Sequence, residues 1–219
     1  MVYIIGDVHG CYDTLCRLIE KFPNSYDSDI IFVGDVIDRG AKSCEVIDLI
    51  IKHGYKCLLG NHEELMLRYY KKLKGNDANW LIHGGYETLQ SYERNGGFEK
   101  ISEHLNWLIE LPYYFDLPIY DESNRRLFVT HGFGLQYYSL RESSRDEIIW
   151  NRLHKSDEVC SLDSNVFNVF GHDVQQEVYF GKSFAAIDTG CVYYARFESA
   201  SLSALEYPSK KIYKVKYCG

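Results

Sequence analysis

Aspartate, asparagine and histidine residues recur in five short, glycine-containing segments of this 219-residue chain. Each segment directly follows an apolar run that predicts a strand, so the polar residues fall where strands end. In open α/β sheets the ligand crevice lies beyond the carboxyl ends of the strands. The sequence therefore predicts that one crevice receives six side chains, namely Asp7, His9, Asp35, Asn61, His131 and His172.

These six side chains form a mixed oxygen and nitrogen ligand set of two carboxylates, one amide and three imidazoles. Such a set suits Mn²⁺, Fe or Zn²⁺ and contains too much nitrogen for Ca²⁺. Six ligands are too many for one ion that must also hold water, so we expect two ions. Asp35 lies between the other ligands in chain order and is the expected bridge. Two cations about 3.5–4 Å apart can share a hydroxide and clamp the attacked and leaving oxygens of a phosphoester.

Three further residues beside these ligands could complete phosphoester hydrolysis. His62 directly follows Asn61 and is the expected general acid. Asp38 could accept the second N–H of His62; a cap or an ion pair with Arg39 is the alternative role for Asp38. Arg39 offers a planar, two-pronged donor for the non-bridging phosphate oxygens.

The elements that must position these residues form two groups along the chain. The first third predicts strands at 2–5, 30–33 and 57–59, each followed by a helix, with the third helix at 63–73. This alternation indicates a largely parallel sheet that is buried on both faces. Later apolar runs predict a second sheet packed on the first, with strands at 127–130, 166–170, 185–187, 192–197, 202–206 and 212–215. Residues 80–111 are expected to be helical and to form a cap or side subdomain within a single domain, 1–219.

Composition narrows the classes of partner and compartment. The net charge of −7 argues against nucleic acid as the main partner. No apolar run is long enough to cross a membrane, and the stretch before Asp7 is too short for a secretion signal. Seven scattered cysteines without a CxxC pair indicate reduced thiols, and we expect a cytoplasmic protein.

The polar segments also resemble the signature of a known family. Gly6-Asp7-Val8-His9-Gly10, then Gly34-Asp35-Val36-Ile37-Asp38-Arg39-Gly40, then Gly60-Asn61-His62-Glu63, are followed by two separated histidines. This order resembles the PPP-type serine/threonine phosphatases of the calcineurin-like metallophosphoesterase superfamily. Segments 84–92 and 187–191 also resemble the small bacterial and phage lambda-like protein phosphatases.

The resemblance implies an α/β fold, a β-sandwich of two mixed sheets flanked by helices, with Mn²⁺ as the usual ion. Asp7, His9 and Asp35 would hold the first metal. Asp35, Asn61, His131 and His172 would hold the second. Arg152 would be a second phosphate-binding arginine beside Arg39 and Asn61; a surface helix arginine is the alternative.

The leading functional hypothesis is a serine/threonine protein phosphatase that acts on a phosphoprotein or phosphopeptide. The alternatives are a symmetrical diadenosine tetraphosphate hydrolase and a catalytically silent binding scaffold of the same fold. His83 is expected to be a polar packing residue, and Asp173 either a partner of His172 or a turn residue. His53, His104 and His154 are expected on the surface.

Overall fold

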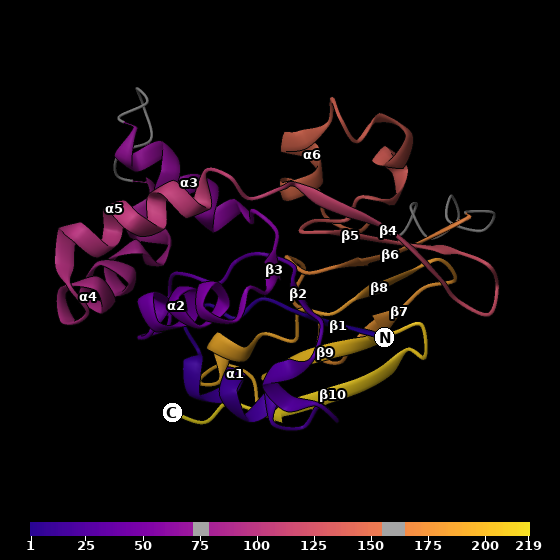
Figure 1. Ribbon diagram of the computed structural model, residues 1–219, viewed down its shortest axis with the longest axis horizontal. Coiled ribbons are helices and arrows are strands. Elements are labelled where there is room, and N and C mark those ends of the chain that lie inside the picture. Colours follow the sequence, from indigo (N-terminus) through magenta and orange to yellow (C-terminus); the bar gives the residue numbers. More distant parts are fainter. Residues whose placement is uncertain (72–78, 155–164) are drawn as a thin grey trace.

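The strands of the protein form two five-stranded sheets in the computed structural model, which describes residues 1–71, 79–154 and 165–219 (Figure 1). The first sheet has the spatial order β10 (Lys211–Lys216), β9 (Ser201–Tyr207), β1 (Val2–Ile5), β2 (Ile30–Phe32) and β3 (Lys56–Cys57). The second sheet has the order β4 (Tyr114–Tyr120), β5 (Arg126–Thr130), β6 (Val166–Phe170), β8 (Phe184–Ala186) and β7 (Tyr179–Phe180).

Both sheets are mixed, with a parallel set of strands extended by antiparallel ones. β1, β2 and β3 are parallel, and β9 joins β1 antiparallel, with β10 antiparallel to β9. In the second sheet β5, β6 and β8 are parallel, while β4 and β7 are antiparallel at the two edges. The expected fold class, a single α/β domain built from two mixed sheets, is confirmed.

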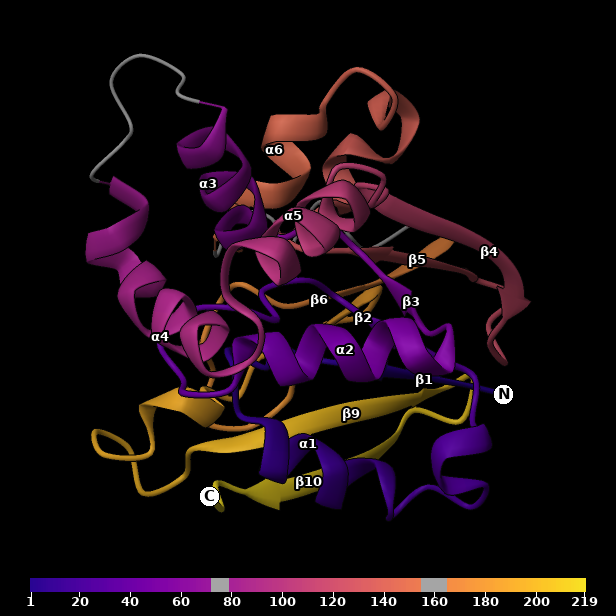
Figure 2. The same ribbon diagram turned by 60° about the vertical axis from the view of Figure 1, so that its left-hand side comes forward.

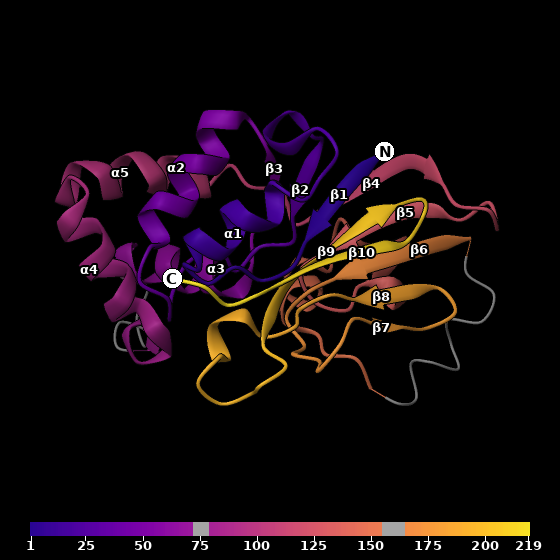
Figure 3. The ribbon, with the colours of Figure 1, turned by 90° about the horizontal axis from the view of Figure 1, so that it is seen from below.

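The two sheets pack face to face because the side chains of each strand alternate between its faces. On β1, Val2 and Ile4 belong to an apolar cluster shared with Val129 and Val169 of the second sheet. Tyr3 and Ile5 point the other way, into a cluster formed with the helices. Figure 3 shows the strands of the two sheets as neighbouring layers. β1 is therefore buried on both faces, and its carboxyl end is held firmly in place.

Helices cover the outer face of the first sheet and extend beyond one of its edges. α1 (Tyr12–Ile19) and α2 (Ser43–His53) lie over this face (Figure 2), while α3 (Asn61–Tyr70), α4 (Tyr86–Arg94) and α5 (Gly97–Leu108) gather at one side (Figure 1). A π-helical turn, η2 (Leu81–Gly85), precedes α4, so helices do occupy the 80–111 region; its role as a cap stays a prediction. The short elements are η1 (Ser25–Asp27), η3 (Leu135–Leu140), α6 (Arg145–Trp150) and η4 (Cys191–Tyr193). No helix among the described residues has the length and apolar character of a membrane span.

Several sequence-based expectations for individual elements are wrong. The expected strand at 192–197 is instead the 3₁₀ helix η4 and a following turn, with Gly190 at φ 69° before it. β9 and β10 join the first sheet, so that sheet is only partly parallel. Strand pairing depends on distant residues, which local apolar patterns do not reveal. His104 is fully buried because its imidazole bonds Tyr92 and Asp48. The helix predicted at 63–73 is α3, and residues 72 and 73 lie outside the described residues.

Candidate active site

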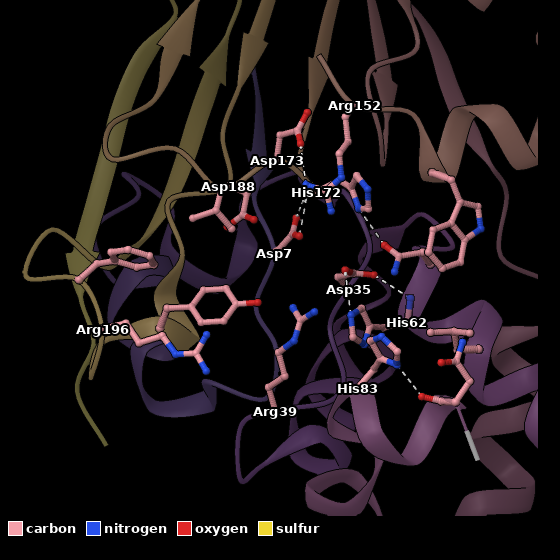
Figure 4. A pocket seen from close by; sticks show the side chains of 17 residues that line it. Asp7, Asp35, Arg39, His62, His83, Arg152, His172, Asp173, Asp188 and Arg196 are labelled. Atoms are coloured by element: carbon pink, nitrogen blue, oxygen red, sulfur yellow. Dashed lines mark hydrogen bonds and ion pairs between the residues drawn. The ribbon is translucent and has the colours of Figure 1, made fainter. Parts of the chain in front are cut away.

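The five polar segments meet at one edge of the sandwich. Asp7 follows β1, Asp35 follows β2, Asn61 opens α3 after β3, His131 follows β5 and His172 follows β6. They border a pocket of about 520 Å³, whose lining includes four of the six expected ligands (Figure 4). The other two, His9 and His131, are buried beneath it. The structure thus brings together all six side chains that the sequence singled out.

Asp35 lies at the centre of the cluster. Its Oδ2 is 3.6 Å from Nε2 of His9 and 3.9 Å from Nε2 of His62, and its Oδ1 is 3.4 Å from Nε2 of His131. Two groups of potential ligands share this carboxylate, and in each group the ligand atoms lie within 4.8 Å of one another. One contains His9 and His62, and the other contains His131 and His172. Asp7 is outside both groups, and its carboxylate instead accepts hydrogen bonds from the backbone N–H of His172.

Hydrogen bonds to the backbone fix which ring nitrogen of two histidines faces Asp35. Nδ1 of His9 lies 2.7 Å from the carbonyl of Ile37, and Nδ1 of His131 lies 3.0 Å from that of Val33. In the neutral ring Nδ1 is therefore the donor, and the lone pair of Nε2 points into the cluster. Metal-binding histidines are oriented in the same way by a carbonyl behind them.

The amide oxygen of Asn61 and the ring nitrogens of two histidines converge on one another in a way that a bound cation would satisfy. Oδ1 of Asn61 is 2.9 Å from Nε2 of His131 and 2.9 Å from Nδ1 of His172. Nε2 of His172 is buried without a partner among the described residues. Burial opposes protonation of His131, but the nearby charge of Asp35 raises the pKa of His131 because it favours the positively charged ring. The donor types and their orientation fit a divalent metal pair.

The crowding of buried carboxylates also indicates a site for divalent metal ions. Burial, together with the charges of Asp188 and Asp35, raises the pKa of Asp7 well above its ordinary value. Burial also raises the pKa of Asp188 to about 6. Bound cations would lower the pKa values of both carboxyl groups, because positive charge favours the ionised carboxylate.

The loops that carry these groups adopt strained backbone conformations. Among the described non-glycine residues with positive φ are His9 (45°), Asp35 (49°), Asp38 (71°), Arg39 (67°) and His172 (64°). Each such residue costs about 1–3 kcal/mol, and such strain clusters at functional sites. The surrounding bonds must therefore hold the loops in place.

Glu63 supplies three of those bonds from beneath the site. It is fully buried, and its carboxylate accepts the backbone N–H groups of Asp35 at 2.8 Å, Val36 at 2.9 Å and Gly60 at 2.9 Å. A side chain at Gly60 would collide with Asp35, so the two loops approach as closely as only glycine permits. Glu63 thus couples the position of Asp35 to the start of α3.

His62 is held by a buried carboxylate, as the sequence predicts for Asp38. Nδ1 of His62 is 2.6 Å from Oδ2 of Asp38. Trp80 donates from Nε1 at 3.0 Å to both oxygens of Asp38, and Thr88 donates from Oγ1 to Oδ1 at 2.7 Å. Asp38 makes no ion pair with Arg39 in this arrangement. Nε2 of His62 is left facing the pocket.

Both expected phosphate-binding arginines line the pocket. Arg39 donates to Nε2 of His9, which places its guanidinium beside the histidine cluster. Arg152 follows α6 and pairs with Asp173 at 3.0 Å. Asp173 also accepts the backbone N–H of Leu153 at 2.6 Å, so it orients the arginine segment.

The structure adds residues that sequence reasoning left without a role. Asp188 lines the pocket beside Asp7, and the only signal for it was its place after an apolar run in the 187–191 segment. His83, expected as a polar packing residue, is instead exposed at the pocket, where its Nδ1 donates to the carbonyl of Asn79. A third cluster, Cys44, Asp48 and His104, lies between α2 and α5, where the ammonium of Lys100 already pairs with Asp48.

The fold and the clustered ligands define a hydrolytic metalloprotein. The family model for calcineurin-like phosphoesterases matches residues 1–189. The chain belongs to this family, whose members use a binuclear centre of divalent metal ions, and the resemblance expected from the motifs is confirmed.

Relatives of near-complete coverage carry two different functional names. The asymmetrical bis(5'-nucleosyl)-tetraphosphatase PrpE of Bacillus subtilis is 29% identical, over 87% of this chain and 86% of its own length. Serine/threonine-protein phosphatase 2 of Escherichia coli is 26% identical, over 86% of this chain and 87% of its own. A protein serine/threonine phosphatase structure from Saccharomyces cerevisiae superposes with a TM-score of 0.66 at 14% identity, covering 100% of this chain and 80% of that one. That likeness shows the shared fold.

Proposed function

We propose that this protein hydrolyses phosphomonoesters at the Asp35 cluster, with Asp7, His9 and Asp35 holding one divalent ion and Asp35, Asn61, His131 and His172 the other. The observation that carries the proposal is the convergence of these donors on Asp35, with His62 directly beside it. These residues would hold Mn²⁺, with Fe or Zn²⁺ as alternatives, and the bound ions would activate a water for attack on phosphorus.

The side chains divide the remaining tasks. Arg39 and Arg152, with the amide of Asn61, bind the non-bridging oxygens and orient the phosphoryl group for in-line attack. His62 donates its proton from Nε2 to the leaving oxygen as the bond between phosphorus and that oxygen breaks. Asp38 stabilises the donating ring through its bond to Nδ1.

A phosphoserine or phosphothreonine side chain is the substrate that this arrangement favours. Its leaving group is an alkoxide, a strong base that needs a proton, and the buried His62–Asp38 pair is built to supply one. The relative in Escherichia coli that is named a serine/threonine-protein phosphatase supports this assignment. The expected ligands and His62 gather at one pocket, which supports an enzyme over a silent scaffold. The net charge of −7 favours a phosphoprotein partner over nucleic acid.

A second candidate is a dinucleoside tetraphosphate, favoured by the name of the relative in Bacillus subtilis. The test compares kcat/KM of the Mn²⁺-loaded protein on a phosphoserine peptide and on diadenosine tetraphosphate. We expect the peptide to be preferred. A preference of about tenfold or more for the dinucleotide would replace the first candidate with the second. Absence of activity on both would refute the proposed function.

A further inference from the structure

The segment between β8 and β9 contributes side chains to the pocket that the reaction outlined above does not use. Tyr193, Arg196 and Phe197 line the pocket. Arg196 lies on the side of the pocket away from His62 (Figure 4). A second hollow of about 510 Å³ adjoins the first, and the two share Arg39, His83, Tyr193 and Arg196. The second hollow does not include Asp35. The pocket therefore continues past Arg39, away from the reacting end.

Two guanidinium groups lie over the same aromatic ring along this extension. Cζ of Arg39 is 5.5 Å and Cζ of Arg196 is 5.7 Å from the ring centroid of Tyr193. Phe197 packs edge-on against that ring, with the centroids 6.2 Å apart. Cation–π contact with the ring positions both guanidinium groups without neutralising their charge.

Arg196 differs from the other two pocket arginines because its guanidinium has no polar partner among the described residues. Arg152 is paired with Asp173, and Arg39 donates to His9. Within 1–71, 79–154 and 165–219, Arg196 forms no ion pair and no side-chain hydrogen bond. An arginine fork that is held beside an anion-binding pocket and left unpaired can accept a second anion.

We propose that Arg196, positioned by Tyr193, binds a second phosphate group of the substrate, next to the one that reacts. The proposal rests on the proposed function, because it assumes that the reacting phosphoryl group lies beside Asp35 and Arg39. Two kinds of substrate supply this chemistry. One is a dinucleoside tetraphosphate, whose neighbouring phosphate follows directly along the chain. The other is a peptide with a second phosphorylated residue.

The experiment compares R196Q with R17Q, a matched control. Arg17 is an exposed arginine on α1 that lines none of these hollows, so its replacement removes the same charge elsewhere. For each Mn²⁺-loaded protein, kcat/KM is measured on a singly phosphorylated peptide, its doubly phosphorylated counterpart and diadenosine tetraphosphate. Two ratios are compared between the variants. They are kcat/KM on the doubly phosphorylated peptide and kcat/KM on diadenosine tetraphosphate, each divided by kcat/KM on the singly phosphorylated peptide.

We expect R196Q to lower at least one ratio by about tenfold, and R17Q to keep both at the wild-type value. A fall confined to the dinucleotide ratio, or to the peptide ratio, identifies which source the subsite serves. R196K retains the charge without the fork and should lower the same ratio less. Ratios in R196Q equal to those of wild type would overturn the proposal.

A binding measurement separates failure of the subsite from failure of the proposed function. Calorimetric titration of the Mn²⁺-loaded protein with inorganic phosphate and with tripolyphosphate needs no turnover. R196Q should weaken tripolyphosphate binding by about tenfold relative to phosphate binding, even if wild type proves inactive on all three substrates. If R196Q weakens the binding of both anions equally, or leaves the binding of both unchanged, a second subsite is contradicted.

Discussion

The His62–Asp38 pair permits a sharp test of the acid role, through the replacement of His62 by asparagine. Nδ1 of His62 is 2.6 Å from Asp38, and its Nε2 is 3.9 Å from Asp35. Asparagine is short and has no proton to transfer at neutral pH. H62N should therefore lose protonation of the leaving group and retain the other donors around Asp35.

The size of the loss follows from the chemistry of the pair. General acid catalysis contributes about 10²–10⁴-fold, or about 3–5 kcal/mol of transition-state stabilisation. The buried bond from His62 to Asp38 is a charge-assisted one, worth about 1.5–3 kcal/mol. D38N should therefore lower kcat about 10- to 150-fold. The double variant should be no slower than H62N, because Asp38 acts only through His62.

The assay varies the basicity of the leaving group. kcat/KM is measured on a phosphoserine peptide, which releases an alkoxide, and on p-nitrophenyl phosphate, which releases a stable phenolate that needs little protonation. In H62N, kcat/KM should fall by the full factor of about 10²–10⁴ on the peptide and by much less on the aryl ester. H53N, which replaces an exposed histidine of α2, is the control. An equal loss on both esters, or metal content that falls in parallel with activity, would refute the reasoning.

Three other changes test the site and its support. D35N should abolish tight binding of both metal ions, measured by mass spectrometry of the dialysed protein. D13N, at a half-buried carboxylate outside the site, should bind two ions, and two tightly bound ions in D35N would contradict the bridge. E63Q should lower the free energy of unfolding, measured in urea, by about 2–4 kcal/mol, because an amide cannot accept all the loop N–H groups that the carboxylate accepts. A loss below about 1 kcal/mol would show that the loops do not depend on Glu63. Burial lowers the pKa of His104 in the folded protein below its unfolded value near 6.5. The unfolded chain therefore binds a proton more readily, and stability falls as the pH drops below about 6.5, by up to about 1.4 kcal/mol per pH unit. The stability difference between wild type and H104Q should therefore shrink from pH 7.5 to pH 5, and a constant difference would show that His104 does not titrate on unfolding.

Local patterns were sufficient for the strands that lead into the site. The apolar runs before Asp7, Asp35 and His172 are buried on both faces, and such strands are recognisable from composition alone. The same patterns misplaced residues 192–197, whose aromatic residues are typical of a strand but which form a turn beside the pocket. A sequence window cannot distinguish aromatic side chains in a sheet from aromatic side chains that line a cavity.

The sequence by itself predicted the candidate ligand side chains and their order, because ligand type and glycine-flanked spacing follow from the chemistry of metal binding. It also indicated that Asp38 would accompany His62. Only the tertiary structure decided that β9 and β10 complete the first sheet, that Glu63 anchors the Asp35 loop, and that Arg196 reaches the pocket. These features depend on contacts between residues far apart in the chain, whose energies arise from burial and pairing rather than from any local preference.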